Sequence, residues 1–213
     1  MNRDRQQSEQ RLIDAVGQIL ATEGFSALGI NAVARTAGVD KVLIYRYFDG
    51  LPDLLRAYGE SGDFWPSMDE VLDRDVEAIR SLPLAARVET VVIGLFDALR
   101  NRPQTIEILA WEAVEQNALT ETLAGIREQW AQKVISETMT DAADHDQDLL
   151  ALASLLVAGF QYLLIRSRRS AIYGGLELTT DQGWERIRTA IRLACSDPGR
   201  GATVADPIFS RED

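Results

Sequence analysis

Apolar residues recur at helical spacing along nearly the whole chain, and almost no stretch alternates with a period of two. In the first expected helix, Leu12, Val16 and Ile19 share one face, and Gly24 follows as a suitable helix end. The pattern therefore predicts an all-α protein. The expected helices cover about 9–23, 30–37, 40–47, 51–60, 68–80, 84–101, 104–115, 118–138, 146–167 and 181–195.

Turn-forming residues divide this run of helices into two parts. Gly59 and Gly62 loosen the chain before Pro66, which indicates a domain boundary there. The expected units are a three-helix domain at 1–50, a connecting helix at about 51–60, a larger helical domain at 61–195 and a flexible tail at 196–213.

Residues 30–48 have the pattern of a helix-turn-helix. Small alanines on the first helix let a second helix cross close by, and Gly38 permits the sharp turn between them. Asp40 is placed to cap the second helix with its carboxylate. Ile44 and Phe48 then face inward, four residues apart. The side chains left outward are Lys41, Val42, Leu43, Arg46 and Tyr47.

These outward residue types favour a helix that reads a DNA groove. Arginine and lysine offer donors to guanine, tyrosine hydroxyls reach phosphate oxygens, and valine or leucine can meet a thymine methyl group. On the Tyr45-Arg46-Tyr47 triplet alone, an ordinary exposed helix with solvated side chains remains the alternative.

Residues 11–60 resemble the DNA-binding domain of the tetracycline-repressor (TetR) family. The shared landmarks are a first helix ending in Glu-Gly-Phe, the Ala-Gly-Val turn, and a lysine separated by three residues from Tyr-Arg-Tyr-Phe. The resemblance implies a homodimer that binds a palindromic double-stranded operator and is released by a small, mostly apolar effector. It implies repression as the commonest outcome and leaves activation open. By resemblance, the candidate base contacts are Lys41, Val42, Leu43 and Arg46, the candidate phosphate contacts are Tyr45 and Tyr47, and Arg35 is a further DNA contact.

Three positions depart from the family pattern. Gly29 stands where a serine or threonine often caps a helix, so no hydroxyl reaches a phosphate there. Leu43 replaces a small polar residue, which favours a methyl contact, and Leu51 replaces a basic residue. We therefore expect fewer charged DNA contacts than is usual for the family.

Charge is distributed unevenly along the chain. The net charge is -11, yet residues 1–50 hold six basic and six acidic side chains, against 16 and 27 in the rest. Because phosphate binding needs local positive charge, the neutral first part keeps a DNA-binding role open. Arg3 and Arg5 are spaced to enter a minor groove as an arm, although a disordered, solvated tail is the favoured interpretation.

Cysteine usage and hydropathy favour a cytoplasmic protein without a membrane span. The single cysteine, Cys195, excludes an internal disulfide, and the polar start of the chain does not fit a secretory signal. The longest apolar run, at 149–165, contains Ser154 and Gln161 and falls short of the roughly 20 residues that a membrane helix needs.

Two helices of the larger domain are candidates for pairing with a second copy of the chain. The helix at 146–167 is apolar nearly all round, and the last helix carries an apolar stripe. A four-helix interface between two subunits would bury both, whereas a core helix within one chain is the alternative. The candidate interface residues are Leu152, Leu155, Leu156, Gly159, Trp184, Ile187 and Ile191.

Aromatic residues gather in the same domain and can line an apolar cavity for an effector. Thr90, Glu112 and Gln161 are candidates for a polar contact there, and plain core packing is the alternative for each residue taken singly. The candidate pocket residues are Phe64, Trp65, Phe96, Trp111, Glu112, Trp130, Phe160 and Tyr162.

No catalytic, cofactor or metal site is predicted. His145 is the sole histidine, and the acids around it lack the ordered spacing of a calcium loop. No glycine-rich phosphate loop, HExxH or GxSxG motif occurs. The alternative function from another class is an all-α small-molecule carrier or interaction module with a vestigial helix-turn-helix.

Overall fold

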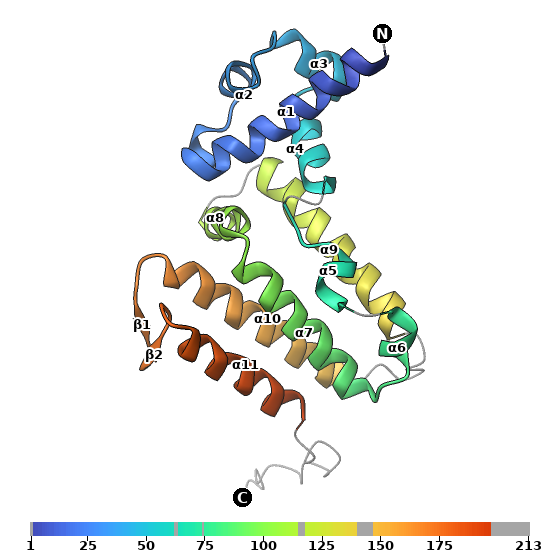
Figure 1. Ribbon diagram of the computed structural model, residues 1–213, viewed down its shortest axis with the longest axis vertical. Helices are drawn as coiled ribbons and strands as arrows, with labels where there is room; N and C mark the ends of the chain where they lie inside the picture. The colour runs from blue at the N-terminus through green and yellow to red at the C-terminus, as the bar shows by residue number, and fades with distance from the viewer. Residues whose placement is uncertain (1, 62–63, 74, 115–117, 140–146, 197–213) are drawn as a thin grey trace, which may run out of the picture.

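The computed structural model describes residues 2–61, 64–73, 75–114, 118–139 and 147–196. These residues form α-helices, one short 3-10 helix and one two-stranded hairpin, which confirms the all-α fold class (Figure 1). The elements are α1 (Asn2–Thr22), η1 (Phe25–Ala27), α2 (Ile30–Ala37), α3 (Val42–Phe48), α4 (Leu51–Glu60), α5 (Met68–Leu72), α6 (Val76–Arg80), α7 (Leu84–Arg100), α8 (Pro103–Glu112), α9 (Ala118–Thr138), α10 (Gln147–Ser167), β1 (Ile172–Tyr173), β2 (Leu176–Glu177) and α11 (Asp181–Cys195).

Helices α1, α2 and α3 form a small head at one end of the molecule, and α5 to α11 form a larger body (Figure 1). The apolar face of α1 enters the core of the head, where Leu12, Val16 and Ile19 are fully buried. Phe25, which follows the end of α1, is only 4% exposed and packs into the core of the head. The helical periodicity of the first fifty residues thus builds one apolar core.

Helix α4 joins the head to the body. Its apolar face buries Leu54, Leu55 and Tyr58. Its last turn lies against α9, where a Cβ atom added to Gly59 would come within 2.4 Å of the Ile126 Cδ1 atom. The atom closest to this position is the end of the Ile126 side chain, so the connecting helix packs directly on the body here.

Helix α7 lies at the centre of the body, between α5, α10 and α11 (Figure 1). An aromatic cluster joins three of these helices. The ring centroid of Phe96 lies 5.5 Å from that of Phe160 on α10 and 6.0 Å from that of Trp184 on α11. All three side chains are buried, so they fix α10 and α11 against α7.

Two elements differ from the sequence-based expectation. A single helix was expected at about 68–80, but Asp73 adopts a left-handed conformation with a φ of 44° and ends α5. The carboxylate of Asp75 then caps α6 by accepting a hydrogen bond from the Glu77 N–H at 3.2 Å. The hairpin of β1 and β2 was not expected because each strand has two residues, too few to show alternation.

The start of the chain also differs. We expected a disordered tail or an arm around Arg3 and Arg5, and a first helix beginning near residue 9. Helix α1 instead begins at Asn2. The Arg5 guanidinium and the Glu9 carboxylate, one helical turn apart, form an ion pair at 2.7 Å that supports this early start. The expected tail, apart from Ser196, lies outside the described residues.

Candidate functional site

The helix-turn-helix is closed by a left-handed glycine and held from α1. Gly38 has a φ of 62°, which glycine adopts without strain, and ends α2 as the sequence predicts. The Arg11 guanidinium of α1 donates hydrogen bonds to the carbonyl oxygens of Ala37 and Gly38, the latter at 3.1 Å. These bonds fix the last turn of α2 against α1. Sequence reasoning gave Arg11 no role.

The start and the inner face of α3 follow the prediction. The Asp40 carboxylate accepts a hydrogen bond from the Val42 N–H at 2.8 Å, so this residue caps the helix. Ile44 is fully buried and anchors the helix to the core of the head. The inner face of α2 is buried through Val33, Ala34 and Ala37.

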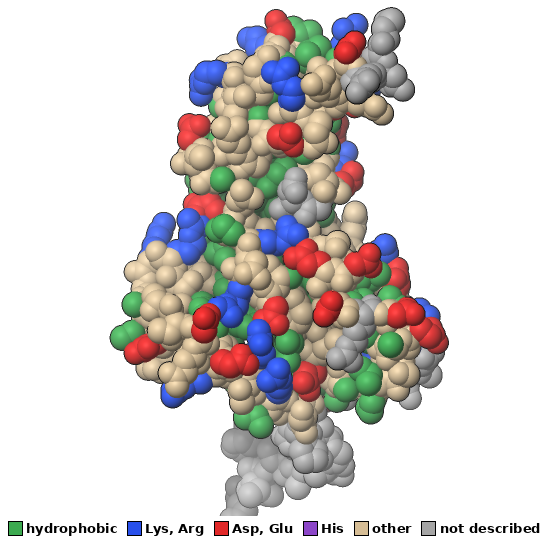
Figure 2. Space-filling model, viewed as in Figure 1, with side chains coloured by type: hydrophobic (Ala, Val, Ile, Leu, Met, Phe, Trp, Pro, Cys, Tyr) green, Lys and Arg blue, Asp and Glu red, His purple; other side chains and the backbone are tan. Residues whose placement is uncertain are grey.

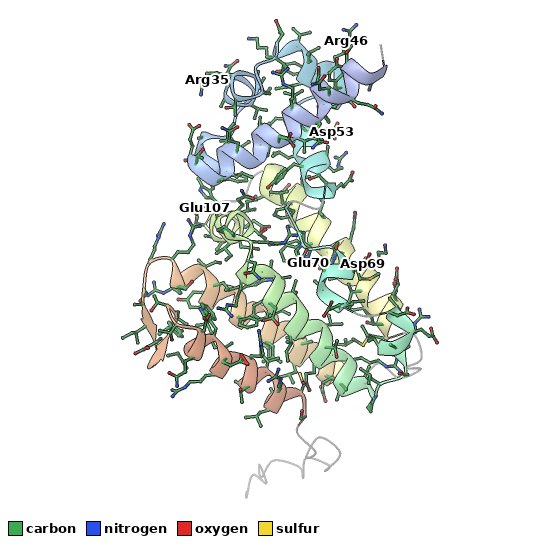
Figure 3. The ribbon with its side chains drawn as sticks, viewed as in Figure 1. Arg35, Arg46, Asp53, Asp69, Glu70 and Glu107 are labelled. Atoms are coloured by element: carbon green, nitrogen blue, oxygen red, sulfur yellow. The ribbon has the colours of Figure 1, made fainter. Side chains whose placement is uncertain are left out.

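The outer face of α3 is free to meet a partner. Val42 is 60% exposed and Tyr45 is 55% exposed, and Lys41 and Arg46 are exposed beside them. Arg35 on α2 is exposed as well, and Figure 3 places Arg35 and Arg46 at the end of the molecule away from the body. Among the described residues, these three cations have no ion-pair partner. The face therefore offers unpaired donors next to an apolar side chain and a tyrosine.

Two residues that we expected to point outward lie partly inside. Leu43 and Tyr47 are half-buried and pack against the core of the head. The guanidinium of Arg5 lies over the Tyr47 ring, 5.2 Å from its centroid. For Tyr47 the early start of α1 explains the difference, because its first turns bring Arg5 onto the tyrosine ring. Tyr45, rather than Tyr47, is the more exposed tyrosine of α3.

The two helix starts that depart from the family pattern carry no hydroxyl. Gly29 precedes α2 and Gly50 precedes α4, and neither start has a side-chain cap. At the start of α4, Pro52 has no N–H to donate, and the Asp53 carboxylate pairs with Arg56 at 2.6 Å. Basic and acidic side chains are interspersed over the face in Figure 2, as the neutral charge balance of the head leads one to expect.

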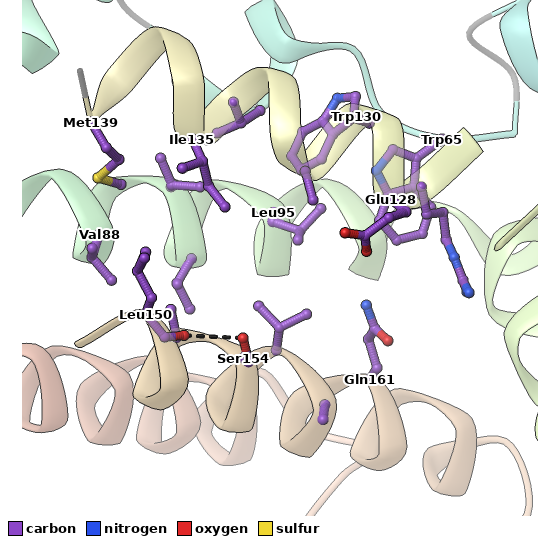
Figure 4. A pocket seen from close by; sticks show the side chains of 18 of the residues that line it. Trp65, Val88, Leu95, Glu128, Trp130, Ile135, Met139, Leu150, Ser154 and Gln161 are labelled. Atoms are coloured by element: carbon purple, nitrogen blue, oxygen red, sulfur yellow. Dashed lines mark hydrogen bonds between the residues drawn. The ribbon is translucent and has the colours of Figure 1, made fainter. Parts of the chain in front are cut away.

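The body contains a cavity of about 370 Å³ between α7, α9 and α10 (Figure 4). Its walls are mostly valine, leucine, isoleucine and alanine side chains, with Met139 at one end and Trp65 and Trp130 at the other. Glu128 and Gln161 lie at the tryptophan end. Such an apolar cavity with a few polar groups is typical of a small-molecule site.

Trp65 and Trp130 are the two of the eight candidate pocket residues that line this cavity, and the candidate polar contact Gln161 lines it too. The other six lie outside its lining. Phe96 and Phe160 belong to the aromatic cluster on α7 described above. Phe64 is fully buried between Tyr58 and Trp65.

The remaining three candidates lie near other elements. Trp111 packs against Phe25 of the head, with ring centroids 5.2 Å apart. Tyr162 is 48% exposed and contacts the Tyr173 ring of the hairpin at 5.7 Å. Glu112 pairs with Arg127, whose guanidinium lines the cavity and lies 5.7 Å from the Trp65 centroid. Burial raises the pKa of Glu112, and the charge of Arg127 opposes this rise.

The candidate pairing surface divides into an outer and an inner set. Leu155 is 71% exposed, Gly159 is exposed, and Leu152 and Leu156 are half-buried. The apolar stripe of α11, in contrast, is not available for pairing. Its residues Trp184, Ile187 and Ile191 are 6%, 7% and 2% exposed, because they pack against α7 within the same chain. This part of the prediction is wrong, and the outward face of α11 instead exposes 69% of Leu193.

Helix α10 is unusually apolar for its exposure. The stretch Asp148–Ser167 has a mean hydropathy of 1.9, and only 17% of it is buried within the chain. By length and composition alone it could cross a bilayer, contrary to our expectation that the apolar run is too short. An apolar helix with one side on the core and the other side exposed indicates a surface that another molecule covers.

The described residues contain no group of three or more histidine, cysteine, aspartate or glutamate side chains that could hold a metal ion. Cys195 is buried at the end of α11. His145 and the acids around it at 141, 144 and 146 lie outside the described residues.

The helix-turn-helix also matches a known family. Residues 12–58, which span the head from α1 to most of α4, match the model of the tetR family of bacterial regulatory proteins. The head of this chain belongs to the tetR family. Solved structures of the family share the fold over most of the chain. A TetR family transcription regulator from Marinobacter aquaeolei is 18% identical and covers 92% of this chain and 97% of its own, with a TM-score of 0.53.

Two further similar proteins extend the comparison. The transcriptional regulator FadR from Bacillus subtilis, solved with stearoyl-CoA, is 16% identical, with a TM-score of 0.58 and coverage of 88% of this chain and 97% of its own. The transcriptional regulator SrpR from Pseudomonas putida is 28% identical over 118 residues, which are 54% of this chain and 52% of SrpR. The chain thus matches about half the length of that relative.

Proposed function

We propose that this tetR-family chain is a ligand-responsive, DNA-binding transcription regulator that represses by occupying a palindromic operator as a homodimer. The single observation that carries the proposal is the outer face of α3. Val42, Tyr45 and Arg46 are exposed together on a short helix whose inner face is anchored by Ile44, and the exposed Lys41 directly precedes this helix. A rigid helix with unpaired cations, a tyrosine and an apolar side chain fits the major groove.

The exposed face of α10 supports the homodimer. One α3 helix reads only one half-site, so a twofold pair of heads is needed for a palindrome. Leu155 on α10 and Leu193 on α11 are exposed on neighbouring helices, and Gly159 has no atom within 4 Å of its added Cβ position. A second copy packed on these helices would cover the apolar surface and form a four-helix interface. The same arrangement favours a cytoplasmic protein over a membrane-inserted one.

The cavity supports a small-molecule effector. Its walls are mainly apolar, and a volume of about 370 Å³ lies in the range of ligand sites in proteins. FadR, whose fold is similar, was solved with stearoyl-CoA bound. We propose that an effector occupies the corresponding domain of this chain.

Two contacts connect the cavity to the head. Trp111 and Glu112 are neighbours at the end of α8. Trp111 packs on Phe25 of the head, and Glu112 pairs with the cavity residue Arg127. Helix α4 adds a second route through Gly59 and α9. An effector that binds one placement of α8 and α4 better than another would shift the spacing of the two heads, whereas equal affinity for both would shift nothing.

Selection of bound DNA from a pool of genomic fragments tests the regulator function. We expect enrichment of a palindromic site, with affinity that falls steeply as salt rises. A protein that retains no sequence would instead be an all-α carrier with a vestigial helix-turn-helix, and the proposal would be refuted.

Two variants then separate the roles of the exposed residues. Arg46→Ala is expected to relax the sequence preference and to cost about 1–3 kcal/mol, because it removes a base contact. Tyr45→Phe is expected to weaken binding alike on matched and mismatched DNA, because it removes a hydroxyl contact to a phosphate. Binding isotherms on both DNAs at several salt concentrations make the comparison.

A further inference from the structure

We propose that the cavity between α7, α9 and α10 is selective for a ligand that joins an apolar body to a positively charged group. This inference deepens the effector site of the proposed function and rests on that function for its role in the cell. The argument comes from the two ends of the cavity, which differ in chemistry (Figure 4).

One end of the cavity is mainly apolar, and the Ser154 hydroxyl near it donates a hydrogen bond to the Leu150 carbonyl oxygen at 3.0 Å. The residues that meet there are Val88 on α7, Ile135 on α9, Met139 directly after α9, and Leu150 on α10. None of these side chains offers a charge or a strong hydrogen-bonding group. This end fits a hydrocarbon chain or an aromatic ring and gives a charged group no partner.

The charges at the other end do not balance. Arg127 is the sole cation among the described lining residues, and the Glu112 carboxylate pairs with it through contacts of 2.5 and 2.8 Å. Glu128 is an exposed residue that also lines the cavity, and its carboxylate accepts a hydrogen bond from Gln132 at 3.2 Å. Among the described residues no cation pairs with Glu128. After Arg127 and Glu112 cancel, one negative charge is left at this end.

The two tryptophans make a second, independent observation that points to a ligand. Trp65 is 5% exposed and Trp130 is half-buried, and neither buried indole N–H has an acceptor among the described residues. Buried donors in folded proteins nearly always have a partner, so a bound molecule or water completes them. The rings lie 6.1 Å apart, edge to face, beside Glu128. Aromatic rings next to a carboxylate are a favourable setting for a cation, and the Arg127 guanidinium already lies over the Trp65 ring in this way.

An anionic ligand is the main competitor and fits less well. The anionic group of such a ligand could accept hydrogen bonds from the indoles. It would, however, meet the Glu128 carboxylate and would have to compete with Glu112 for Arg127. A bulky polyanion such as an acyl-coenzyme A, the kind of ligand solved with FadR, would find no unpaired cation in the described lining. The lining therefore favours a cation over an anion of the same size.

Two probes with the same hydrocarbon chain and opposite charge test the proposal. Decyltrimethylammonium and decyl sulfate, both below their micelle concentrations, are titrated into the full-length protein by calorimetry, and circular dichroism checks that the fold persists. We expect the ammonium probe to bind at least tenfold more tightly. Glu128→Gln should reduce this ratio to less than threefold, and Glu128→Lys should invert it.

Two further variants locate the effect. Glu121→Gln removes an exposed charge from the same helix, outside the cavity, and should leave the ratio unchanged. Ala131→Trp should fill the cavity from α9 and abolish binding of the ammonium probe. Equal or tighter binding of decyl sulfate, a ratio unaffected by Glu128→Gln, or no binding of either probe would overturn the inference.

The readout is independent of DNA. Failure to select an operator would refute the regulator function and leave the charge preference measurable, while failure to bind the ammonium probe would leave the DNA-binding function standing. The two outcomes are therefore distinguishable.

Discussion

Alanine in place of Gly94 tests the tightest contact in the body. A Cβ atom at this position on α7 would lie 1.8 Å from the carbonyl oxygen of Val71 on α5. Real Cβ atoms essentially never come within 3.0 Å of such an atom, so α5 would have to move by at least about 1.2 Å. Val71 and Leu72 are each 2% exposed, and the movement would disturb the packing of both.

The expected cost follows from two opposing effects. Overpacking of a core costs about 1–3 kcal/mol, and the obstacle is backbone, which places the cost at the upper end. Alanine in a helix gains about 1 kcal/mol over glycine. Gly94→Ala should therefore lower the free energy of unfolding by about 2 kcal/mol. Urea unfolding followed by tryptophan fluorescence measures this change, since all four tryptophans lie in the body.

Gly125 on α9 provides the matched control. No atom lies within 4 Å of its added Cβ position, so Gly125→Ala should stabilise the protein by about 0.5–1 kcal/mol. The same substitution in two helices is thus expected to have opposite signs. If Gly94→Ala were neutral or stabilising, the close approach of α5 and α7 would not exist as described.

Three other substitutions probe the pairing surface and the head. Leu155→Glu should convert a dimer to a monomer in light scattering, because it places a charge on the exposed face of α10, whereas Val114→Glu, at a residue 79% exposed on another surface, should leave the mass unchanged. Equal behaviour of the two variants would argue against the α10 interface. Arg11→Gln should destabilise the head by about 1 kcal/mol, measured by urea unfolding followed by the circular dichroism of its helices, through loss of the hydrogen bonds to the α2–α3 turn. Arg5→Gln should weaken operator binding several-fold with little change in stability, because the Tyr47 ring loses the guanidinium that lies over it. Unchanged binding in a gel-shift titration would show that this contact has no role.

The helix-turn-helix was predictable because its signals are local. Gly38, Asp40 and Ile44 each act within a few residues of their own position, as a left-handed turn, a helix cap and a core anchor, and all three do so in the structure. Spacing along one helix could not reveal the clamp from Arg11, because the residues it binds lie 26 and 27 positions further along the chain.

The body was less predictable because its contacts join distant segments. The apolar stripe of α11 fits pairing within one chain and pairing between chains equally well, and only the position of α7 decides that Trp184 belongs to the core. The same holds for the aromatic residues. Trp65 lines the cavity while Phe96 packs in the core, although hydropathy and residue type hardly distinguish them.

The division of α3 into an anchored and a free face has an evolutionary consequence. Ile44 is buried, while Val42 and Tyr45 contribute mostly exposed surface. After gene duplication, the exposed positions can change with little effect on folding, because few packing contacts depend on them. Paralogues with this fold are thus able to acquire specificity for new promoters by a few substitutions, and each intermediate sequence still folds.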